Sequence, residues 1–390
     1  MIKFKKYGKI AQCSQFINDN GNNEYYISIC PEKPASDATA LKDIEKSYLS
    51  LLKKNNLSEK TQVFCRFYLS DMENQREILS ASKIFKISGN GACATIEQCP
   101  LNGSRISLLA YHIKGNFKKE ISYQNEDKWS NTVKLQGKSY SMIFNANLHG
   151  LSNINSEEQT NKIFSIYKSV LKNQNSTLLE NSIRTWIYVR DIDNNYSGMV
   201  KARREFFARE GLTPQTRFIA STGIEGKPKE KNCFVSMDAL SFSKLDEKQI
   251  IRISAPSHLN PTHEYGVTFE RGTRLDFGDR SHLYISGTAS IDKTGKIMYI
   301  NDVKKQTQRV FENINALMKP HKSSVKDLMY MIVYLRNMTD FSAVKKVVDK
   351  MKINDKPIFY VEGAVCRPGW LVEIEGSAII PNDSKWPKFF

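Results

Sequence analysis

Residues 358–380 read IFYVEGAVCRPGWLVEIEGSAII, in which two β-rich runs flank a turn-forming CRPG segment, and two earlier stretches have the same design. These are GACATIEQCPLNGSRISLLAYHI at 91–113 and IASTGIEGKPKEKNCFVSMDALSF at 219–242. When the three are aligned on their closing strands, Ser107, Ser236 and Glu373 occupy one position. A repeated scaffold with a single carboxylate predicts one active site on a pseudo-symmetric frame.

A second pattern repeats upstream of each stretch, which indicates that the whole unit is triplicated. It is a strand-like run centred on Tyr68, Tyr188 or Tyr334, with Asp or Asn three residues later. Helical patterns precede these strands at residues 40–52, 159–171 and 306–318, and further helical patterns follow at 196–209 and 341–351.

Hairpin signals complete the unit. Residues 282–291 alternate in β fashion before a DKTG turn, and residues 139–150 hold the same place in the second copy. The predicted fold is α+β, with three β-β-α-β-α-β-β units that each bury a core behind one sheet. We expect units at residues 1–118, 119–250 and 251–390, with joints near 115–125 and 243–264, where polar residues, Gly and Pro interrupt the patterns.

Bulk composition favours a globular cytosolic protein. The chain has 390 residues, of which 40% are hydrophobic, and it contains neither a run of about 18 apolar residues nor an apolar leader segment. The seven cysteines form no CxxC pair, which argues against a disulfide framework or a zinc site.

The formal net charge of +16 raises a nucleic-acid interpretation, but the lysines are scattered and no aromatic-rich RNA motif accompanies them. A lysine-biased surface that aids solubility is the simpler explanation. The same charge would suit a small anionic substrate bound by converging arginines.

The third copy resembles the Rid/YjgF family through ISGTASI (285–291), DVKKQTQRVFENINALM (302–318), VYLRNMTDF (333–341) and LVEIEGSA (371–378). The resemblance implies a chorismate-mutase-like trimeric architecture, so three copies in one chain imply an internal pseudo-trimer that functions as a monomer. It also implies that Glu373 is the water-handling glutamate of that family. The substrate-binding arginine of imine deaminases is replaced here by Ile358, with Ala220 and Ala92 at the equivalent positions, which argues against simple 2-imino-acid hydrolysis.

A narrower resemblance, to chorismatases, covers most of residues 130–380. It rests on RTWIYVRDIDNNYSGMVKARREFFAREG (184–211), TRFIASTGIEG (216–226), ISGTASI and CRPGWLVEIEG (366–376). It implies cleavage of chorismate with release of pyruvate, Glu373 as the catalytic residue, and a role in aromatic secondary metabolism. Cys366, seven residues before Glu373, matches the branch that forms 3-hydroxybenzoate. The glycine-histidine element expected after ISGTASI is absent, so 4-hydroxybenzoate and a diene diol stay open as products.

Chorismate chemistry assigns roles to further residues. Glu373, flanked by Val372, Ile374 and Trp370, is a carboxylic acid suited to protonate the enolpyruvyl methylene carbon. Cys366 would shape the pocket or assist proton movement and would not act as a covalent nucleophile. Two substrate carboxylates require guanidinium groups, and the candidates are Arg203, Arg217 and Arg271.

The remaining candidates are small or aromatic. Ser221, Thr222, Gly223 and Gly287 offer small side chains and backbone donors where two copies meet, and Phe269 would pack on the substrate ring. The predicted chemistry needs no metal and no cofactor. Two alternatives stay open, a Rid-type hydrolase of enamines or imines and a non-catalytic binder of a metabolite or RNA.

Overall fold

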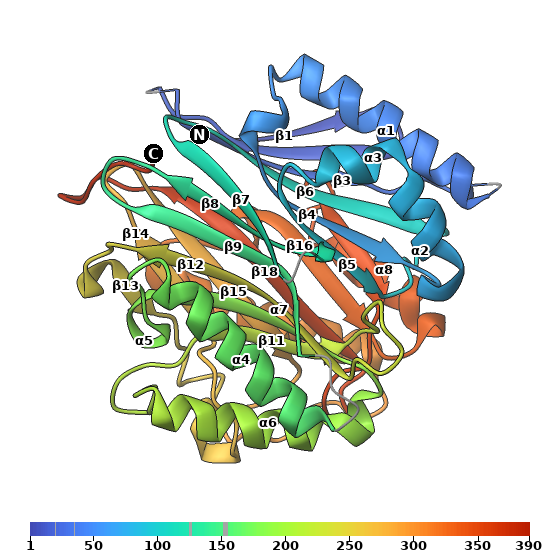
Figure 1. Cartoon of the computed structure of the whole chain (residues 1–390). Helices are drawn as coiled ribbons and strands as arrows, with labels where there is room; N and C mark the ends of the chain where they lie inside the picture. Colours follow the sequence, from blue (N-terminus) through green and yellow to red (C-terminus); the bar gives the residue numbers. More distant parts are fainter. Residues whose placement is uncertain (20, 35, 125–126, 151–154) are drawn as a thin grey trace.

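A computed structural model describes the chain apart from residues 20, 35, 125–126 and 151–154, and it contains three six-stranded mixed sheets (Figure 1). The first sheet has the order β1-β2-β3-β6-β4-β5, and the other two repeat it as β7-β8-β9-β12-β10-β11 and β13-β14-β15-β18-β16-β17. In each sheet the final pair of neighbours, β4–β5, β10–β11 or β16–β17, is parallel. The other neighbouring strands are antiparallel. The predicted α+β chain of three tandem units is confirmed.

The strands of the first unit are β1 (Ile2–Tyr7), β2 (Ala11–Phe16), β3 (Asn23–Ile29), β4 (Gln62–Leu69), β5 (Ala92–Glu97) and β6 (Ile106–Lys114). Those of the second are β7 (Lys118–Gln124), β8 (Asp127–Gln136), β9 (Ser141–His149), β10 (Ser182–Val189), β11 (Ala220–Glu225) and β12 (Val235–Ser243). Those of the third are β13 (Ile250–Arg252), β14 (Gly272–Asp276), β15 (Arg280–Ala289), β16 (Leu328–Leu335), β17 (Ile358–Glu362) and β18 (Val372–Pro381).

The helices lie on the outer faces of the sheets (Figure 1). They are α1 (Asp37–Lys54), α2 (Met72–Ala81), α3 (Lys83–Ser88), α4 (Ser156–Lys172), α5 (Leu178–Asn181), α6 (Ile192–Arg209), α7 (Val303–Met318) and α8 (Phe341–Lys350). Short 3-10 turns are η1 (Glu59–Thr61), η2 (Glu247–Gln249), η3 (Thr262–Tyr265), η4 (Lys319–His321), η5 (Val325–Asp327) and η6 (Met338–Asp340). Each predicted helical pattern lies within a helix or overlaps one.

Side-chain caps explain where two of the long helices, α4 and α7, begin. The α4 N-cap Asn155 accepts a hydrogen bond from the Glu158 backbone amide at 3.0 Å, and the α7 N-cap Asp302 accepts one from the Lys305 amide at 3.0 Å. These caps satisfy backbone amides that have no partner within the helix.

Each unit contains one strand more than the sequence pattern predicted. The additional strands are the sheet edges β1, β7 and β13, and the last two lie largely inside the predicted joints. The first joint is thus only the turn at 115–117 in the described residues, and its final position, 125, lies outside them. Edge strands such as IKFKKY carry lysines that discourage pairing with other chains, and this polar pattern hides their strand character.

The strand register places the repeated positions opposite one another. Tyr68 pairs with Ser107, Tyr188 with Ser236, and Tyr334 with Glu373. The three positions that were aligned from the sequence are therefore equivalent in the structure. The predicted turn after residue 291, by contrast, closes only an isolated bridge between Ile291 and Ile297, and β15 instead forms its hairpin with the preceding β14.

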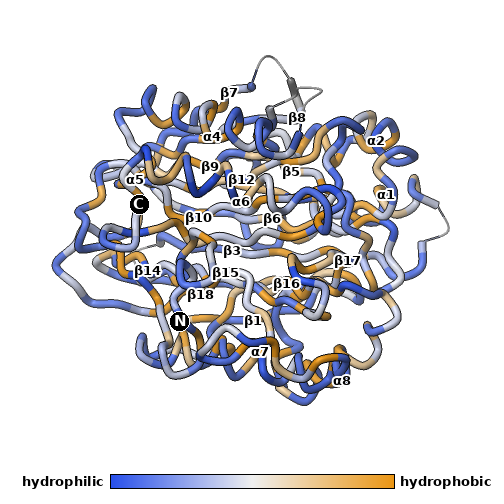
Figure 2. Tube along the Cα trace, turned by 90° about the horizontal axis from the view of Figure 1, so that it is seen from below, coloured by the Kyte–Doolittle hydropathy of each residue, from blue (hydrophilic) through white to orange (hydrophobic). Residues whose placement is uncertain are grey.

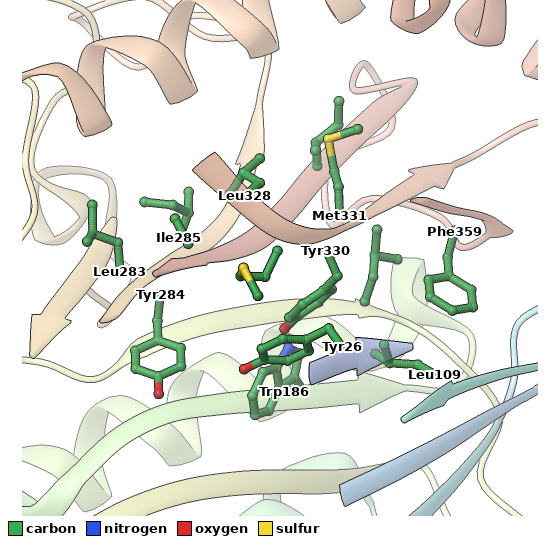
Figure 3. Close-up of a cluster of buried hydrophobic side chains, with 14 of the residues drawn as sticks. Tyr26, Leu109, Trp186, Leu283, Tyr284, Ile285, Leu328, Tyr330, Met331 and Phe359 are labelled. Atoms are coloured by element: carbon green, nitrogen blue, oxygen red, sulfur yellow. The ribbon is translucent and has the colours of Figure 1, made fainter. Parts of the chain in front are cut away.

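A shared hydrophobic core lies between the three sheets. Apolar residues concentrate along the strands, and hydrophilic ones lie towards the periphery (Figure 2). Tyr26 of β3 stacks on Tyr330 of β16 with ring centroids 5.0 Å apart, next to Trp186 of β10, so each of the three units contributes a ring (Figure 3). The units therefore fold as one body with a pseudo-threefold arrangement.

Each pair of units is also joined by a buried ion pair. Arg66 meets Asp238 between the first and second units, Arg184 meets Glu375 between the second and third, and Arg280 meets Glu24 between the third and first, at 2.8, 2.6 and 2.7 Å. Buried pairs add little net stability because both charges lose their water, but an unpaired partner is costly. The three pairs thus favour one register of assembly.

No helix in the described part of the chain combines the length and apolar character needed to cross a membrane.

Candidate active site

A cavity of about 450 Å³ lies where the second and third units meet. The second unit contributes α6 and β11 to its wall, and the third contributes the 265–271 segment, β15, and the loop and strand from Cys366 to Glu373. Its size suits a small organic molecule. The site predicted from the repeat therefore falls in a cleft between units.

Direct contacts between β11 and β15 hold the two halves together. The Ser221 amide donates to Ser286 Oγ at 2.9 Å, and Ser286 Oγ donates to the Glu270 carbonyl at 2.6 Å. One strand position further along, the Gly287 amide donates to Thr222 Oγ1 at 2.9 Å. These bonds place the SGT segment of one unit against the STG segment of the other.

Glu373 lies on the inner wall of this cavity, on β18, and is 5% exposed. It rests on Gly287, since a Cβ atom added there would be 2.1 Å from Glu373 Oε1. Burial is the main cause that raises the pKa of Glu373 to about 8, and the neighbouring Glu375 carboxylate adds to the effect. The side chain is therefore mostly a neutral acid at neutral pH.

Glu375, two residues further along β18, is fully partnered. Its Oε1 accepts a hydrogen bond from Trp186 Nε1 at 2.8 Å, and its Oε2 forms the ion pair with Arg184 and accepts from Thr222 Oγ1. All three partners belong to the second unit. The two carboxyl groups on β18 thus differ: both oxygens of Glu375 have partners, whereas Glu373 faces the cavity.

Two buried arginines face the cavity from opposite units. Arg203 on α6 is 2% exposed and Arg271 is 7% exposed. Both guanidinium groups lie over the Phe269 ring, 5.9 and 5.5 Å from its centroid. Arg203 Nε and Nη2 and Arg271 Nε have no hydrogen-bond partner among the described residues. Buried donors without partners are expected where a ligand supplies the acceptors.

Arg217 corrects the prediction made from the sequence, because it does not line the cavity. Its Nε donates to the Leu179 carbonyl at 2.6 Å and its Nη2 to the Ser182 carbonyl at 2.8 Å. The residue lies just before β11, where its side chain turns towards the end of α5 instead of the inter-unit cleft. Its role is to tie backbone segments of the second unit together.

The other predicted residues lie as follows. Ser221, Gly223, Gly287, Phe269 and Cys366 line the cavity, whereas Thr222 lies behind the wall and contacts Glu375 and Gly287. Burial raises the pKa of the Cys366 thiol to about 12, with the nearby Glu373 as the next cause. The thiol is therefore protonated and a poor nucleophile.

Sequence reasoning missed several cavity residues. Tyr196 and Tyr265 line the cavity, with Tyr196 beside the Cys366 thiol and Tyr265 under the Arg271 guanidinium at 5.4 Å. Lys201 and Arg204 on α6 and Arg367 on the loop before β18 add positive charge to the cavity lining. The YSGMVKARR run carried part of this signal, because Tyr196, Val200 and Arg203 fall on one helical face.

The two serine positions do not form comparable cavities. Ser236 borders a space of about 30 Å³ between the first and second units, which holds little more than water. Ser107 lies against the Cys30 thiol and is fully buried. Among the described residues, Glu373 alone of the three equivalent positions opens into a ligand-sized cavity.

Comparison with known proteins supports the fold assignment. Residues 277–380 match the family model described as Endoribonuclease L-PSP. A crystal structure of a chorismatase superposes with a TM-score of 0.62 at 18% identity, covering 82% of this chain and 93% of that one. This chain has the chorismatase fold. Three Rid/YjgF-like units in tandem, the architecture predicted from the sequence, are thereby shown.

Single-unit proteins match one third of the chain. RidA from the Antarctic bacterium Psychrobacter sp. PAMC 21119 covers 33% of this chain and 99% of its own at 23% identity, with a TM-score of 0.28. Escherichia coli TdcF with bound serine covers 33% of this chain and 98% of its own at 22% identity, with a TM-score of 0.28.

Proposed function

We propose that this protein cleaves the enolpyruvyl ether of chorismate to pyruvate and a hydroxybenzoate, with 3-hydroxybenzoate the favoured product. One observation carries the proposal: a neutral, buried Glu373 shares a cavity of about 450 Å³ with two buried guanidinium groups that retain free donors. The chorismatase fold agrees with this assignment.

The charges of the cavity suit a dianion. Chorismate has two carboxylates, and Arg203 and Arg271 present unpaired N–H groups from opposite sides of the inter-unit cleft. A planar guanidinium binds a carboxylate through two parallel hydrogen bonds. Because the two arginines flank Phe269, the substrate ring is expected to lie against that side chain.

Glu373 supplies the proton for the first step. Its O–H transfers a proton to the methylene carbon of the enolpyruvyl group, which becomes a methyl group and leaves an oxocarbenium-like centre. The ring carbon–oxygen bond then breaks, and pyruvate departs with that oxygen as its keto group. The Glu373 carboxylate recovers a proton from the ring fragment, so the enzyme returns to its starting state.

The fate of the ring decides the product. If the neighbouring ring hydroxyl displaces the side chain and the ring aromatises, chorismate gives pyruvate and a hydroxybenzoate with no other reactant. If water attacks instead, one water molecule is consumed and a diene diol forms. The aromatising route needs a dry site, and Cys366, with its neutral thiol beside Tyr196, fills space next to Glu373 where a polar residue would hold water.

The proposal is tested by incubating the purified protein and its Glu373→Gln variant with chorismate while pyruvate is followed and the ring product is identified by chromatography. We expect pyruvate and 3-hydroxybenzoate from the wild type and a rate at least about 10²-fold lower from the variant, because the amide has no acidic proton to donate. Detection of a diene diol or of 4-hydroxybenzoate would instead show that the predicted product is wrong.

Absence of pyruvate from both proteins would overturn the proposal. The same samples should then be tested with freshly generated 2-imino acids, the substrates of the Rid-type alternative, and with RNA at low salt. The Rid-type alternative has less structural support, because Ala220 is buried, bridges to Glu270 and provides no arginine at the imine-deaminase position.

A further inference from the structure

The two glutamates of β18 form an interacting pair. They are two residues apart on the same face of the strand, so their Cα atoms lie about 7 Å apart. Glu373 is 5% exposed and Glu375 is 1% exposed. Two carboxyl groups this close and this dry repel each other when both are ionised, so one of them is expected to keep a proton.

Hydrogen bonds determine which carboxyl group is ionised. Glu375 receives a donor on each oxygen, from Trp186 to Oε1 and from Arg184 and Thr222 to Oε2. Glu373 receives no hydrogen bond from any residue that the structure describes. Donors stabilise a carboxylate, so Glu375 is the anion and Glu373 holds the proton.

The groups that face Glu373 come from several elements. The charged and titratable groups around it are Glu375 on β18, Arg184 on β10, Arg271 before β14, Tyr265 in η3, Cys366 and Arg367 on the loop before β18, and Tyr196, Lys201, Arg203 and Arg204 on α6. Burial and then Glu375 raise the pKa of Glu373, whereas Arg184 and Arg271 lower it. Of the charged neighbours, Glu375 is therefore the strongest.

We propose that Glu375 is a positioning residue that acts through Glu373, keeping the donor proton on that side chain until the substrate binds. This inference rests on the proposed function, in which Glu373 delivers that proton. Thr222 makes the arrangement rigid. Its hydroxyl donates a hydrogen bond to Glu375 and accepts one from the backbone amide of Gly287, the residue on which Glu373 rests. The Arg184–Glu375 ion pair and the proton donor Glu373 are therefore linked through Thr222 and Gly287.

The chain supplies a matched control for this idea. Asp238 lies two residues after Ser236, as Glu375 lies two residues after Glu373, and it forms the equally buried pair with Arg66. Asp238→Asn and Glu375→Gln therefore remove the same kind of carboxylate from the same kind of pair. Only the second lies beside a carboxylic acid that opens into the large cavity.

The first measurement needs no substrate: the Glu373 carboxyl is titrated by ¹³C NMR in glutamate-labelled protein, and its signal is assigned with Glu373→Gln. Glu375→Gln should shift this titration to lower pH by about one unit or more, because a like charge has been removed. Glu375→Asp should restore most of the wild-type value. Asp238→Asn should leave it within about 0.3 units, since Glu375, Arg184 and Arg271 are the charges that act on Glu373 and Asp238 is not one of them.

The second measurement is the pH profile of kcat/KM, whose alkaline limb should move with the NMR titration in each variant. If Glu375→Gln does not fold, Arg184→Met combined with Glu375→Met removes both charges without leaving one unpaired, and it should also shift the titration downwards. An unchanged Glu373 titration in the variants that remove the Glu375 charge, Glu375→Gln and Arg184→Met combined with Glu375→Met, would overturn the inference. Absence of chorismate turnover would overturn the proposed function instead, because the NMR titration does not depend on it.

Discussion

Gly287 and Glu373 are in contact across two neighbouring strands, and a Cβ atom on Gly287 would lie 2.1 Å from Glu373 Oε1. Glycine is therefore required at position 287 because the Glu373 carboxyl group occupies the space that a side chain would need, and not because of the backbone conformation. This contact brings together the SGTAS and VEIEG segments, which are about 85 residues apart in the sequence.

Gly287→Ala tests that contact. The added methyl group must displace the Glu373 carboxyl, and a shift of about 1 Å at a reacting group is expected to lower turnover by about 10²-fold or more. Pyruvate release from chorismate measures the loss, and circular dichroism checks the fold. Gly223→Ala is the matched control in the same cavity, because its Cβ would meet Met199 and Tyr196 at an ordinary 3.5 Å. Equal losses in both variants would contradict the account.

Substitutions of the two cavity arginines should have different effects from a substitution of Arg217. Arg203→Gln and Arg271→Gln each remove a charge-assisted contact worth about 1.5–3 kcal/mol, so kcat/KM should fall by roughly 10- to 150-fold, mainly through KM. Arg217→Lys should instead lower the free energy of unfolding and leave KM unchanged, because Arg217 binds backbone carbonyls. A KM effect in Arg217→Lys would show that this correction is wrong.

The raised pKa of Glu373 should be visible in stability as well as in activity. From its ordinary pKa of 4.5 up to about 8, the unfolded chain has released this proton and the folded chain keeps it. Wild-type stability relative to Glu373→Gln is therefore expected to fall by up to about 1.4 kcal/mol per pH unit across this range. Urea unfolding at pH 5, 6.5 and 8 measures the difference, and a difference that is constant with pH would contradict the assignment.

Phe389 should contribute strongly to the packing of the third unit. It is fully buried, its ring packs on Phe277 and His282 at 5.0 and 4.7 Å, and the Arg280 guanidinium lies over it at 4.9 Å. Phe389→Ala should lower the free energy of unfolding by about 3–5 kcal/mol. Denaturant unfolding measures this cost, with the 44%-exposed Tyr299→Ala as a control expected to change stability by less than about 0.5 kcal/mol.

The sequence predicted the unit order, the central strands and the position of Glu373 because repeated patterns fix strand register. Aligning three closing strands places Ser107, Ser236 and Glu373 together, and pairing with the three tyrosines reproduces that equivalence. The edge strands were missed because a short, lysine-rich edge such as residues 2–7 alternates apolar and polar residues only over Ile2–Lys5 and has no fully buried side chain.

The site was less predictable where side-chain direction decides the role. Arg203 and Arg217 have the same chemistry, but one projects from a helix face into the cleft and the other turns back onto carbonyls. The Arg184–Glu375 pair was also missed, since a pair that spans two units leaves no local spacing signal. Such long-range relationships require the packed structure.

Proton delivery by Glu373 is tested most directly by running the chorismate reaction in D₂O and examining the released pyruvate by NMR, with Glu373→Gln alongside. The Glu373 carboxyl proton exchanges with D₂O between turnovers. If Glu373 then delivers one deuteron to the methylene carbon, wild-type pyruvate should appear early with a CH₂D methyl group, while the variant releases little or none. Pyruvate released equally fast by Glu373→Gln, or no pyruvate from the wild type, would contradict the account.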